Sequence, residues 1–259
     1  AERDLGAGHR TVLSGDIDQN DAPFAPQADS DSDPNTPSQT DHISGGNSYH
    51  VFVFDGRAEG AVTTATVLDG VTVTGGQANG SSPESQGGGL YCDGQGPGNA
   101  CSPQVTNAIF MGNAAGRGGA IYTNGSGGGT SRPQVTNALL TGNVSGSAGG
   151  AIYNSGDAGT SSPVITGVTV TGNVAGTRGG AIYNSGLSGT SRPQITNTIL
   201  WENTTGSGGD VDNDSAAPEY RHSLVQGLDL TGMGTGNLDG TGPANAPRFV
   251  DAGDLEGPD

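Results

Sequence analysis

The amino-acid sequence predicts an all-β protein, a single right-handed parallel β-helix with coils of about 30 residues and no significant helix. Three observations support this fold class. A phrase of the form GG[AG][IL]Y recurs at 87–91, 118–122, 149–153 and 179–183. The runs between these phrases, such as PQVTNALLTGN, alternate β-branched with polar residues, which is typical of strands. Glycine fills 49 of the 259 positions, so an ordinary globular core is not expected.

Each repeat is expected to form one coil of a solenoid, because a unit of this size cannot bury its apolar face alone. Three short parallel strands are expected per unit, within the GGAIY, QVTN and ALLTG segments. Adjacent coils would lie about 4.8 Å apart, so that equivalent residues stack in ladders. The recurring apolar columns are Leu90, Ile121, Ile152 and Ile182; Val105, Val135, Ile165 and Ile195; and Phe110, Leu140, Val170 and Leu200.

Glycine and asparagine mark the turns of the repeat. The glycine pairs fall where the chain must turn tightly into a strand, and glycine reaches positive φ there without steric cost. An asparagine recurs every 30 residues at a strand end, where it tolerates the left-handed region and its amide can bond from coil to coil. These positions are expected to form a structural ladder, with a ligand site as the alternative: Asn113, Asn143, Asn173 and Asn203.

The whole chain, 1–259, is expected to form one β-helix domain. Its N-terminal coils, 10–86, contain an acidic excursion at 18–47, four regular coils span 87–207, and an atypical coil and tail span 208–259. No apolar run reaches the ~20 residues that a membrane span needs, so no span is expected in this chain. Because it starts with alanine and no signal peptide, the sequence is interpreted as a mature product or an excised segment.

The charge balance is strongly acidic. Nine arginines and no lysine face 26 acidic residues, which gives a formal net charge of −17. Nucleic acid is a poor partner for such a surface, so none is expected. The acidic surface is interpreted as a solubilising coat, with cation binding as the alternative.

The two cysteines, Cys92 and Cys101, bracket one loop in the segment YCDGQGPGNACS. We expect them to form a disulfide, which suits an oxidising compartment, and two free thiols are the alternative. A zinc site is disfavoured, because two sulfurs with no histidine nearby make half of such a site.

Several segments together resemble the secreted bacterial β-helix proteins that carry repeats of the polymorphic outer membrane protein type and often end in a choice-of-anchor domain. The segments are TVLSGDIDQND, SYHVFVFDG, TVLDGVTVTGG, the four GG[AG][IL]Y units, NTILWENTTG and HSLVQG…NLDG…PRFVDAGD, which together cover about 10–253. The resemblance implies the fold and an extracellular or cell-surface location. It implies no catalytic residue. It also implies further coils before and more chain after this sequence.

The acidic excursion carries alternating oxygen-bearing side chains of the kind found in calcium loops. Calcium prefers six to eight oxygen ligands, and alternating positions can turn several side chains inward. The pattern is partial, because the closing glutamate of a twelve-residue calcium loop is missing. A calcium site is therefore a hypothesis, against a solvated acidic loop, and its candidate ligands are Asp16, Asp18, Asn20, Asp29, Asp31 and Asp33. A weaker version of the pattern occurs at 210–214.

A tyrosine follows each inward apolar residue of the GG[AG][IL]Y phrase, so these tyrosines are expected to face outward in one column. Stacked rings would stabilise neighbouring coils by ~0.5–1.5 kcal/mol per pair. The functional alternative is a flat aromatic platform for sugar rings, formed by Tyr91, Tyr122, Tyr153 and Tyr183.

An enzyme is the main rival class, since many β-helices cleave polysaccharides. Such chemistry needs a basic proton acceptor beside calcium, or two carboxylates ~5–10 Å apart across the sugar. Within the regular coils the acids include Asp157, in a loop, and Glu202, in a glycine column, and neither has an evident partner. All four histidines lie outside the repeats.

Taken together, these observations predict an extracellular or cell-surface structural or adhesive module that is not an enzyme. Calcium is expected to order the acidic excursion, and the open ends are expected to join further coils or other copies end to end, forming a rod or filament. Non-catalytic binding of surface glycans is the second hypothesis. A polysaccharide lyase or hydrolase is the third.

Overall fold

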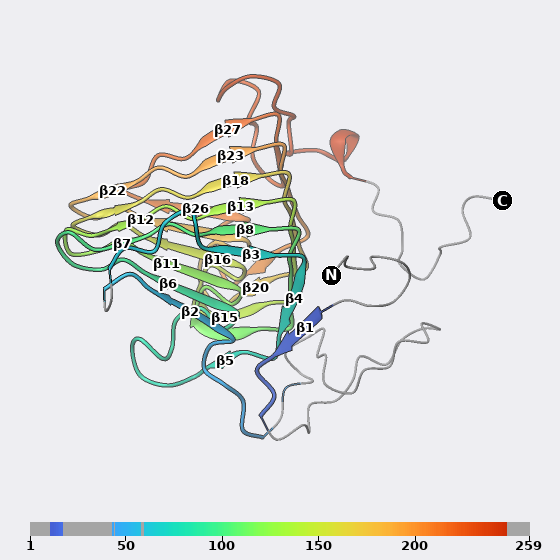
Figure 1. The fold of residues 1–259 in the computed structure, drawn as a ribbon. Helices are drawn as coiled ribbons and strands as arrows, with labels where there is room; N and C mark the ends of the chain where they lie inside the picture. Colours follow the sequence, from blue (N-terminus) through green and yellow to red (C-terminus); the bar gives the residue numbers. More distant parts are fainter. Residues whose placement is uncertain (1–10, 18–42, 44, 58–59, 248–259) are drawn as a thin grey trace, which may run out of the picture.

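The computed structural model describes residues 11–17, 43, 45–57 and 60–247. Within these ranges the chain winds into a parallel β-solenoid. Figure 1 shows the coils stacked in sequence order, from β2 in blue at one end to β27 in orange at the other. Strands that are neighbours within the five sheets pair in parallel, with equivalent residues of successive repeats in register. The prediction of an all-β solenoid with coils of about 30 residues is confirmed.

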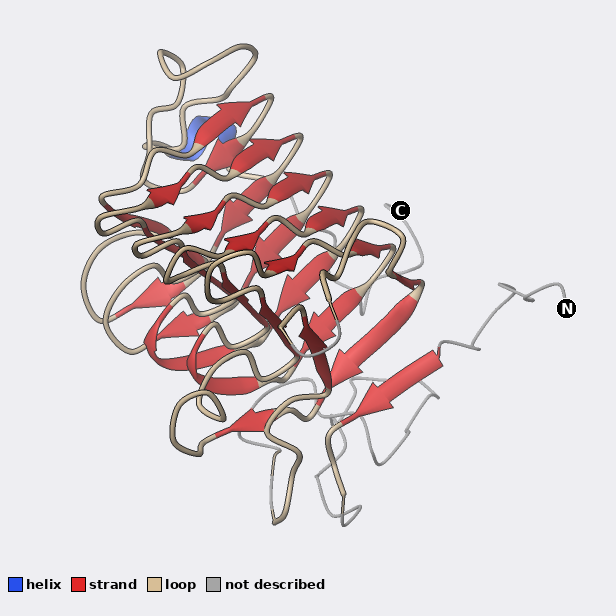
Figure 2. Ribbon diagram, turned by 60° about the vertical axis from the view of Figure 1, so that its left-hand side comes forward, coloured by secondary structure: helices blue, strands red, loops and turns tan. Residues whose placement is uncertain are grey.

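The five sheets run along the solenoid axis and are numbered here in the order in which a coil passes through them (Figure 2). Sheet 1 comprises β3 (Val67–Asp69), β8 (Gln104–Thr106), β13 (Gln134–Thr136), β18 (Val164–Thr166), β23 (Gln194–Thr196) and β27 (Glu219–Arg221). Sheet 2 comprises β1 (Thr11–Ser14), β4 (Val71–Thr74), β9 (Ile109–Met111), β14 (Leu139–Thr141), β19 (Thr169–Thr171), β24 (Ile199–Trp201) and β28 (Leu224–Val225). Sheet 3 comprises β5 (Gln77–Ala78), β10 (Ala114–Arg117), β15 (Val144–Ala148), β20 (Val174–Ala175) and β25 (Thr204–Thr205).

Sheets 4 and 5 complete the coil. Sheet 4 comprises β2 (Phe52–Asp55), β6 (Leu90–Asp93), β11 (Ile121–Asn124), β16 (Ile152–Ser155), β21 (Ile182–Ser185) and β26 (Val211–Asp214). Sheet 5 comprises β7 (Ala100–Cys101), β12 (Thr130–Ser131), β17 (Thr160–Ser161) and β22 (Thr190–Ser191). The three strands expected in each repeat lie in sheets 1, 2 and 4. The strands of sheets 3 and 5 were not expected, because most of them are two residues long and show no alternation.

The core is a set of apolar columns that face the solenoid axis. In sheet 2, the side chains of Phe110, Leu140, Val170 and Leu200 are fully buried, and each pairs in register with the next. Each residue of the other two predicted columns exposes at most 2% of its area. Their burial follows from period-two alternation, which turns every second side chain of a strand toward the axis.

Glycine is required at the entry to sheet 4. Gly118, Gly149 and Gly179 have φ of 63°, 66° and 60°, as the sequence predicted for the first residue of each pair. The second residue of the pair is confined as well, since a Cβ on Gly119 would lie 2.3 Å from the carbonyl oxygen of Gly150 in the next coil. The chain can therefore stack at this corner only without a side chain.

The C-terminal end of sheets 1 and 2 is covered by residues 228–240. Leu230 is fully buried and belongs to the same core cluster as Val225. The N–H of His222 donates to the oxygen of Thr235 at 2.9 Å. A short 3₁₀ helix, η2 (Pro243–Asn245), follows, and the rest of the predicted tail lies outside the described residues. None of the helical structure in the described part of the chain has the length and apolarity of a membrane crossing.

Candidate functional site

The ladder asparagines lie at the corner between sheets 2 and 3 and bond from coil to coil. Asn113, Asn143 and Asn173 are fully buried. The Nδ2 of Asn143 donates to Oδ1 of Asn173 at 2.9 Å, and Oδ1 of Asn143 accepts from the N–H and Nδ2 of Asn113 at 3.1 and 3.0 Å. Asn173 donates in the same way to Asn203 at 2.9 Å. These amides satisfy buried backbone groups, which is a structural role.

One detail expected of these asparagines is wrong. The left-handed conformation falls on the preceding residue of each coil, with φ of 59° at Gly112 and 59° at Glu202, and not on the asparagine. Among the described residues, the asparagines that do adopt positive φ are Asn107, Asn137 and Asn197, at the corner between sheets 1 and 2. The ladder thus needs the amide of asparagine rather than its tolerance of the left-handed region.

Cys92 and Cys101 form a disulfide, as expected, and both lie fully buried in the core. The same two positions hold hydroxyl residues in the next coil, because Thr123 pairs with Cys92 and Ser131 pairs with Cys101. The disulfide therefore closes the loop of a single coil.

The burial of the four tyrosines contradicts the alternative of a flat aromatic platform for sugar rings. The four tyrosines do form a column outside the apolar core, with neighbouring ring centroids 4.9–5.7 Å apart. However, each residue exposes only 4–7% of its area: Tyr91, Tyr122, Tyr153 and Tyr183. The chain entering sheet 4 covers them, and the guanidinium carbon of Arg117 lies 5.6 Å from the ring centroid of Tyr153. Stacked sugar rings cannot reach faces that are already packed.

Burial governs the ionisation of these phenols. It raises the pKa of Tyr122 to about 12, and it raises the pKa of Tyr91 and Tyr153 further. The tyrosines therefore stay protonated at physiological pH and act as hydrogen-bonding groups rather than as bases.

The candidate calcium ligands lie mostly outside the described residues. Asp18, Asn20, Asp29, Asp31 and Asp33 belong to this part of the chain. Asp16 lies beside Asn47 in an isolated antiparallel bridge. Within the described ranges, no three side chains among histidine, cysteine, aspartate and glutamate gather in a way that could hold a metal. Calcium binding by the excursion therefore stays a prediction.

The two acids considered for catalysis occupy structural positions. The carboxylate of Asp157 accepts from the hydroxyl of Ser185 at 2.6 Å and from the N–H of Leu187 at 2.9 Å, which ties two adjacent loops together. Glu202 is exposed and fills the left-handed corner that Gly112, Gly142 and Gly172 fill in earlier coils.

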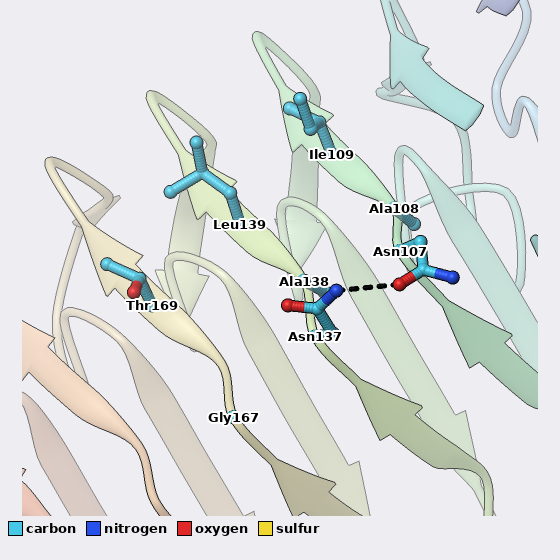
Figure 3. Close-up of a pocket in the computed structure, with 8 residues that line it drawn as sticks. All are labelled: Asn107, Ala108, Ile109, Asn137, Ala138, Leu139, Gly167 and Thr169. Carbon is cyan, nitrogen blue, oxygen red and sulfur yellow. Dashed lines mark hydrogen bonds between the residues drawn. The ribbon is translucent and has the colours of Figure 1, made fainter. Parts of the chain in front are cut away.

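Two surface depressions remain as candidate sites. The first is a shallow groove of about 420 Å³ at the corner between sheets 1 and 2, where Ile109, Leu139 and Thr169 point outward (Figure 3). Its amides serve the fold, since Nδ2 of Asn137 donates to Oδ1 of Asn107 at 2.6 Å. No titratable side chain lines it. The groove is the ordinary outer corner of three successive coils.

The second depression, of about 270 Å³, is called the polar cleft here. It is lined by Arg57, Ser82, Pro83, Gln86, Tyr91, Gln95, Tyr122, Asn124 and Ser126. Unlike the groove, it has no counterpart in later coils, because two departures from the repeat build it. One is Arg57, in the turn after β2, and the other is a longer connection before β6.

The longer connection is visible in the register of the sheets. Ala78 and Leu90 are twelve positions apart, whereas their partners Ala115 and Ile121 are six positions apart. The six extra residues are accommodated in the segment 79–86, which is called the insertion loop here. The oxygen of Ser85 accepts from the N–H groups of Gly116 and Arg117 at 2.9 and 3.1 Å, which fixes the loop against the next coil. The insertion loop thereby forms one wall of the cleft.

Arg57, which lines the cleft, forms an ion pair with the buried carboxylate of Asp93. The side chain of Asp93 has no exposed area, and its Oδ2 lies 2.9 Å from Nε of Arg57. Its Oδ1 accepts from Nδ2 of Asn124 at 3.1 Å and from the N–H of Gln95 at 3.0 Å. The same Nδ2 donates to the hydroxyl of Tyr91 at 3.1 Å. Asp93 is therefore held in one orientation from three sides.

Sequence reasoning missed this site, although two signals for it were present. The spacing before Leu90 is longer than in the other units, and an arginine follows a predicted strand at Arg57. The recurring tyrosines that the sequence did single out include two that line the cleft, Tyr91 and Tyr122, and each exposes only 4% of its area.

Comparison with known families supports the nature of the repeat. A family model for the Chlamydia polymorphic membrane protein repeat matches residues 107–124 and 167–185. No curated protein and no solved structure matches the chain. Both matched segments run from the outer corner through sheet 2 and the ladder asparagine to the glycine pair and the tyrosine of sheet 4. The chain is therefore a parallel β-helix in which two segments match repeats of the polymorphic membrane protein type.

Proposed function

We propose that this chain is a structural and adhesive module of the cell surface. The observation that carries the proposal is that the segments matching the membrane protein repeat are the ones that stack coil on coil. Stacking through core columns, amide ladder and tyrosines makes a rigid body, which suits the display of loops away from a membrane. The buried disulfide agrees with an oxidising compartment.

Display at the surface is tested by labelling intact cells that carry the gene. An antibody against the regular coils should stain unpermeabilised cells, and external protease should remove the signal. Staining that requires permeabilisation would overturn the surface assignment. Adhesion is tested separately, by coating beads with the purified chain and counting beads retained on host cells or on neighbouring bacteria.

We further propose that copies of the chain associate end to end and that their charge controls the association. The regular coils, 87–207, contain three acidic residues and four arginines, so the remaining parts of the chain carry 23 acidic residues and five arginines. The body is nearly neutral, and the negative charge is concentrated in the terminal parts. Because Leu230 and its segment cover sheets 1 and 2 at the C-terminal end, the N-terminal end is the better surface, where Val53 and Val67 expose 51% and 55% of their area.

Repulsion between like charges at the ends would oppose association at 0.01 M salt, where the Debye length is about 30 Å. At 1 M salt the Debye length is about 3 Å, so this repulsion would be much weaker. Calcium bound by the acidic excursion would act in the same direction as salt. Sedimentation velocity at these two salt concentrations should show longer assemblies at the higher one. A monomer under both conditions and with added calcium would refute end-to-end association.

A second function, non-catalytic binding of glycans, is favoured by the polar cleft. Its lining consists of hydroxyls, amides and one paired arginine, which are the groups that convergent polar sites use. A third possibility, cleavage of polysaccharides, is tested by assaying for new reducing or unsaturated ends from acidic polysaccharides.

A further inference from the structure

We propose that the polar cleft binds a single neutral hexopyranose unit through hydrogen bonds, without ring stacking. This inference deepens the glycan-binding function proposed above and relies on it only for the external source of the sugar. The cleft is a built feature, because an inserted loop, a buried carboxylate and an arginine found in one coil meet there.

The volume of the cleft sets the size of the ligand. The volume of about 270 Å³ is just below the ~300–1,000 Å³ of most small-molecule sites. The insertion loop closes one side, held by the two hydrogen bonds to Ser85. Room therefore exists for one small ring and not for an extended chain, so the ligand is expected to be a terminal or branching unit.

The charge of the cleft favours a neutral ligand. Arg57 is its cation, and its Nε lies 2.9 Å from Asp93 and 3.3 Å from Asp55, so two carboxylates already balance it. The other lining groups are amides, hydroxyls and one proline. An anionic sugar would add a third negative charge to this pair, within a chain of net charge −17.

The unused polar atoms match the pattern of adjacent sugar hydroxyls. The terminal nitrogens of Arg57 and the side-chain amide of Gln95 make no hydrogen bond with any described residue, and both line the cleft. Ser126 holds its hydroxyl beside them by donating to Oδ1 of Asn124 at 2.7 Å. The lining thus offers both donors and acceptors, and a hydroxyl group, which both donates and accepts, can satisfy each of them.

Aromatic stacking is not available in this cleft. Tyr91 and Tyr122 expose 4% of their area each, and their ring faces pack against the neighbouring rings of the column. Recognition by hydrogen bonds alone implies modest affinity but clear dependence on individual polar groups.

The test uses saturation-transfer difference NMR with the full chain and four neutral probes, D-glucose, D-galactose, D-mannose and N-acetyl-D-glucosamine. D-glucuronate and D-galacturonate serve as anionic comparisons. At least one neutral sugar should receive saturation, and the double variant Gln95→Ala/Ser126→Ala should weaken its binding by about tenfold, as expected for two lost hydrogen bonds. Neither substitution removes the ion pair, so the variant is expected to fold, which circular dichroism checks.

A matched control is Gln134→Ala, an exposed glutamine on sheet 1 far from the cleft lining, which should bind like the parent chain. The proposal is overturned if no neutral sugar binds, if only the uronates bind, or if the double variant binds as well as the control. Because free sugars in solution are used, a negative result leaves surface display and adhesion untouched, and a failure of surface staining leaves this result untouched.

Discussion

Replacement of Asn143 by alanine should be among the most damaging single changes at the polar residues of the regular coils. Its Nδ2 donates to the oxygens of Phe110 and Thr141 at 3.0 Å each and to Asn173 at 2.9 Å. Its Oδ1 accepts two hydrogen bonds from Asn113. Every one of these groups is part of the corner that joins three successive coils.

The magnitude follows from what the substitution leaves behind. Each lost hydrogen bond contributes about 0.5–1.5 kcal/mol net, and the backbone N–H of Asn113 would be buried with no acceptor, at about 1–3 kcal/mol. Because Asn113 and Asn173 keep other partners, the bonds are not fully additive, and we expect the free energy of unfolding to fall by about 3–5 kcal/mol. This is a large share of the ~5–15 kcal/mol that stabilises a typical protein.

Urea unfolding followed by far-ultraviolet circular dichroism measures the change, and hydrogen exchange of the Asn113 amide localises it. Asn143→Asp separates hydrogen bonding from size, because it keeps the volume and the acceptor but loses the donors and buries a charge. Its destabilisation should shrink at low pH, where the carboxyl group is protonated. Gln134→Ala, at an exposed position, should change stability by less than ~0.5 kcal/mol. A loss for Asn143→Ala no larger than that of Gln134→Ala would refute the structural role of the ladder.

Three further predictions follow from single residues. Burial raises the pKa of Asp210 to about 6, and the hydrogen bond from the amide of Asn203 offsets part of this shift. The charged form of Asp210 is therefore disfavoured in the folded protein, and the free energy of unfolding falls as the pH rises from about 4 through 6. Asp210→Asn should stabilise the chain by about 1–3 kcal/mol at pH 7 in thermal or urea unfolding, with little gain at pH 4. The double variant Cys92→Thr/Cys101→Ser, which copies the residues of the next coil, should lose about 2–3 kcal/mol of unfolding free energy, since it opens a closed loop, and an unchanged urea midpoint would contradict this. Glu202→Gly should raise the stability by about 0.5–1 kcal/mol because Glu202 has φ of 59°, whereas Ala114→Gly, in strand β10, should lower it; equal effects of the two would remove the conformational explanation.

The fold was predictable because the same pattern of apolar residues recurs in every regular coil. Apolar residues at Val105, Val135, Ile165 and Ile195 share one environment, so each copy reinforces the interpretation of the others. Strand β12, with the two residues Thr130 and Ser131, was not predictable, because it is a consequence of stacking and has no pattern of its own.

The burial of the tyrosines could not be foreseen for a related reason. Alternation correctly places Tyr122 and Tyr153 outside the core, but it cannot show that the segment ending at Arg117 folds back over them. Whether an outward side chain reaches solvent depends on how the chain enters the strand, and that geometry is set by the positive φ of Gly118 and by the absence of a Cβ at Gly119.

In a solenoid, the residues that recur are those that each coil needs in order to match its neighbours, and they are therefore occupied by the fold. Asn143 forms hydrogen bonds with neighbouring coils, Tyr153 packs against the next tyrosine ring, and Gly149 makes the turn into sheet 4. These roles leave none of the three free to contact a ligand. A ligand site must then come from residues that interrupt the repeat, since only these add groups whose hydrogen-bonding capacity the stacking does not use. Arg57 and the insertion loop are such interruptions, and they meet over the buried carboxylate of Asp93. The polar cleft is thus the place where the chain departs most from its repeat, and for that reason it is the place where ligand binding is expected.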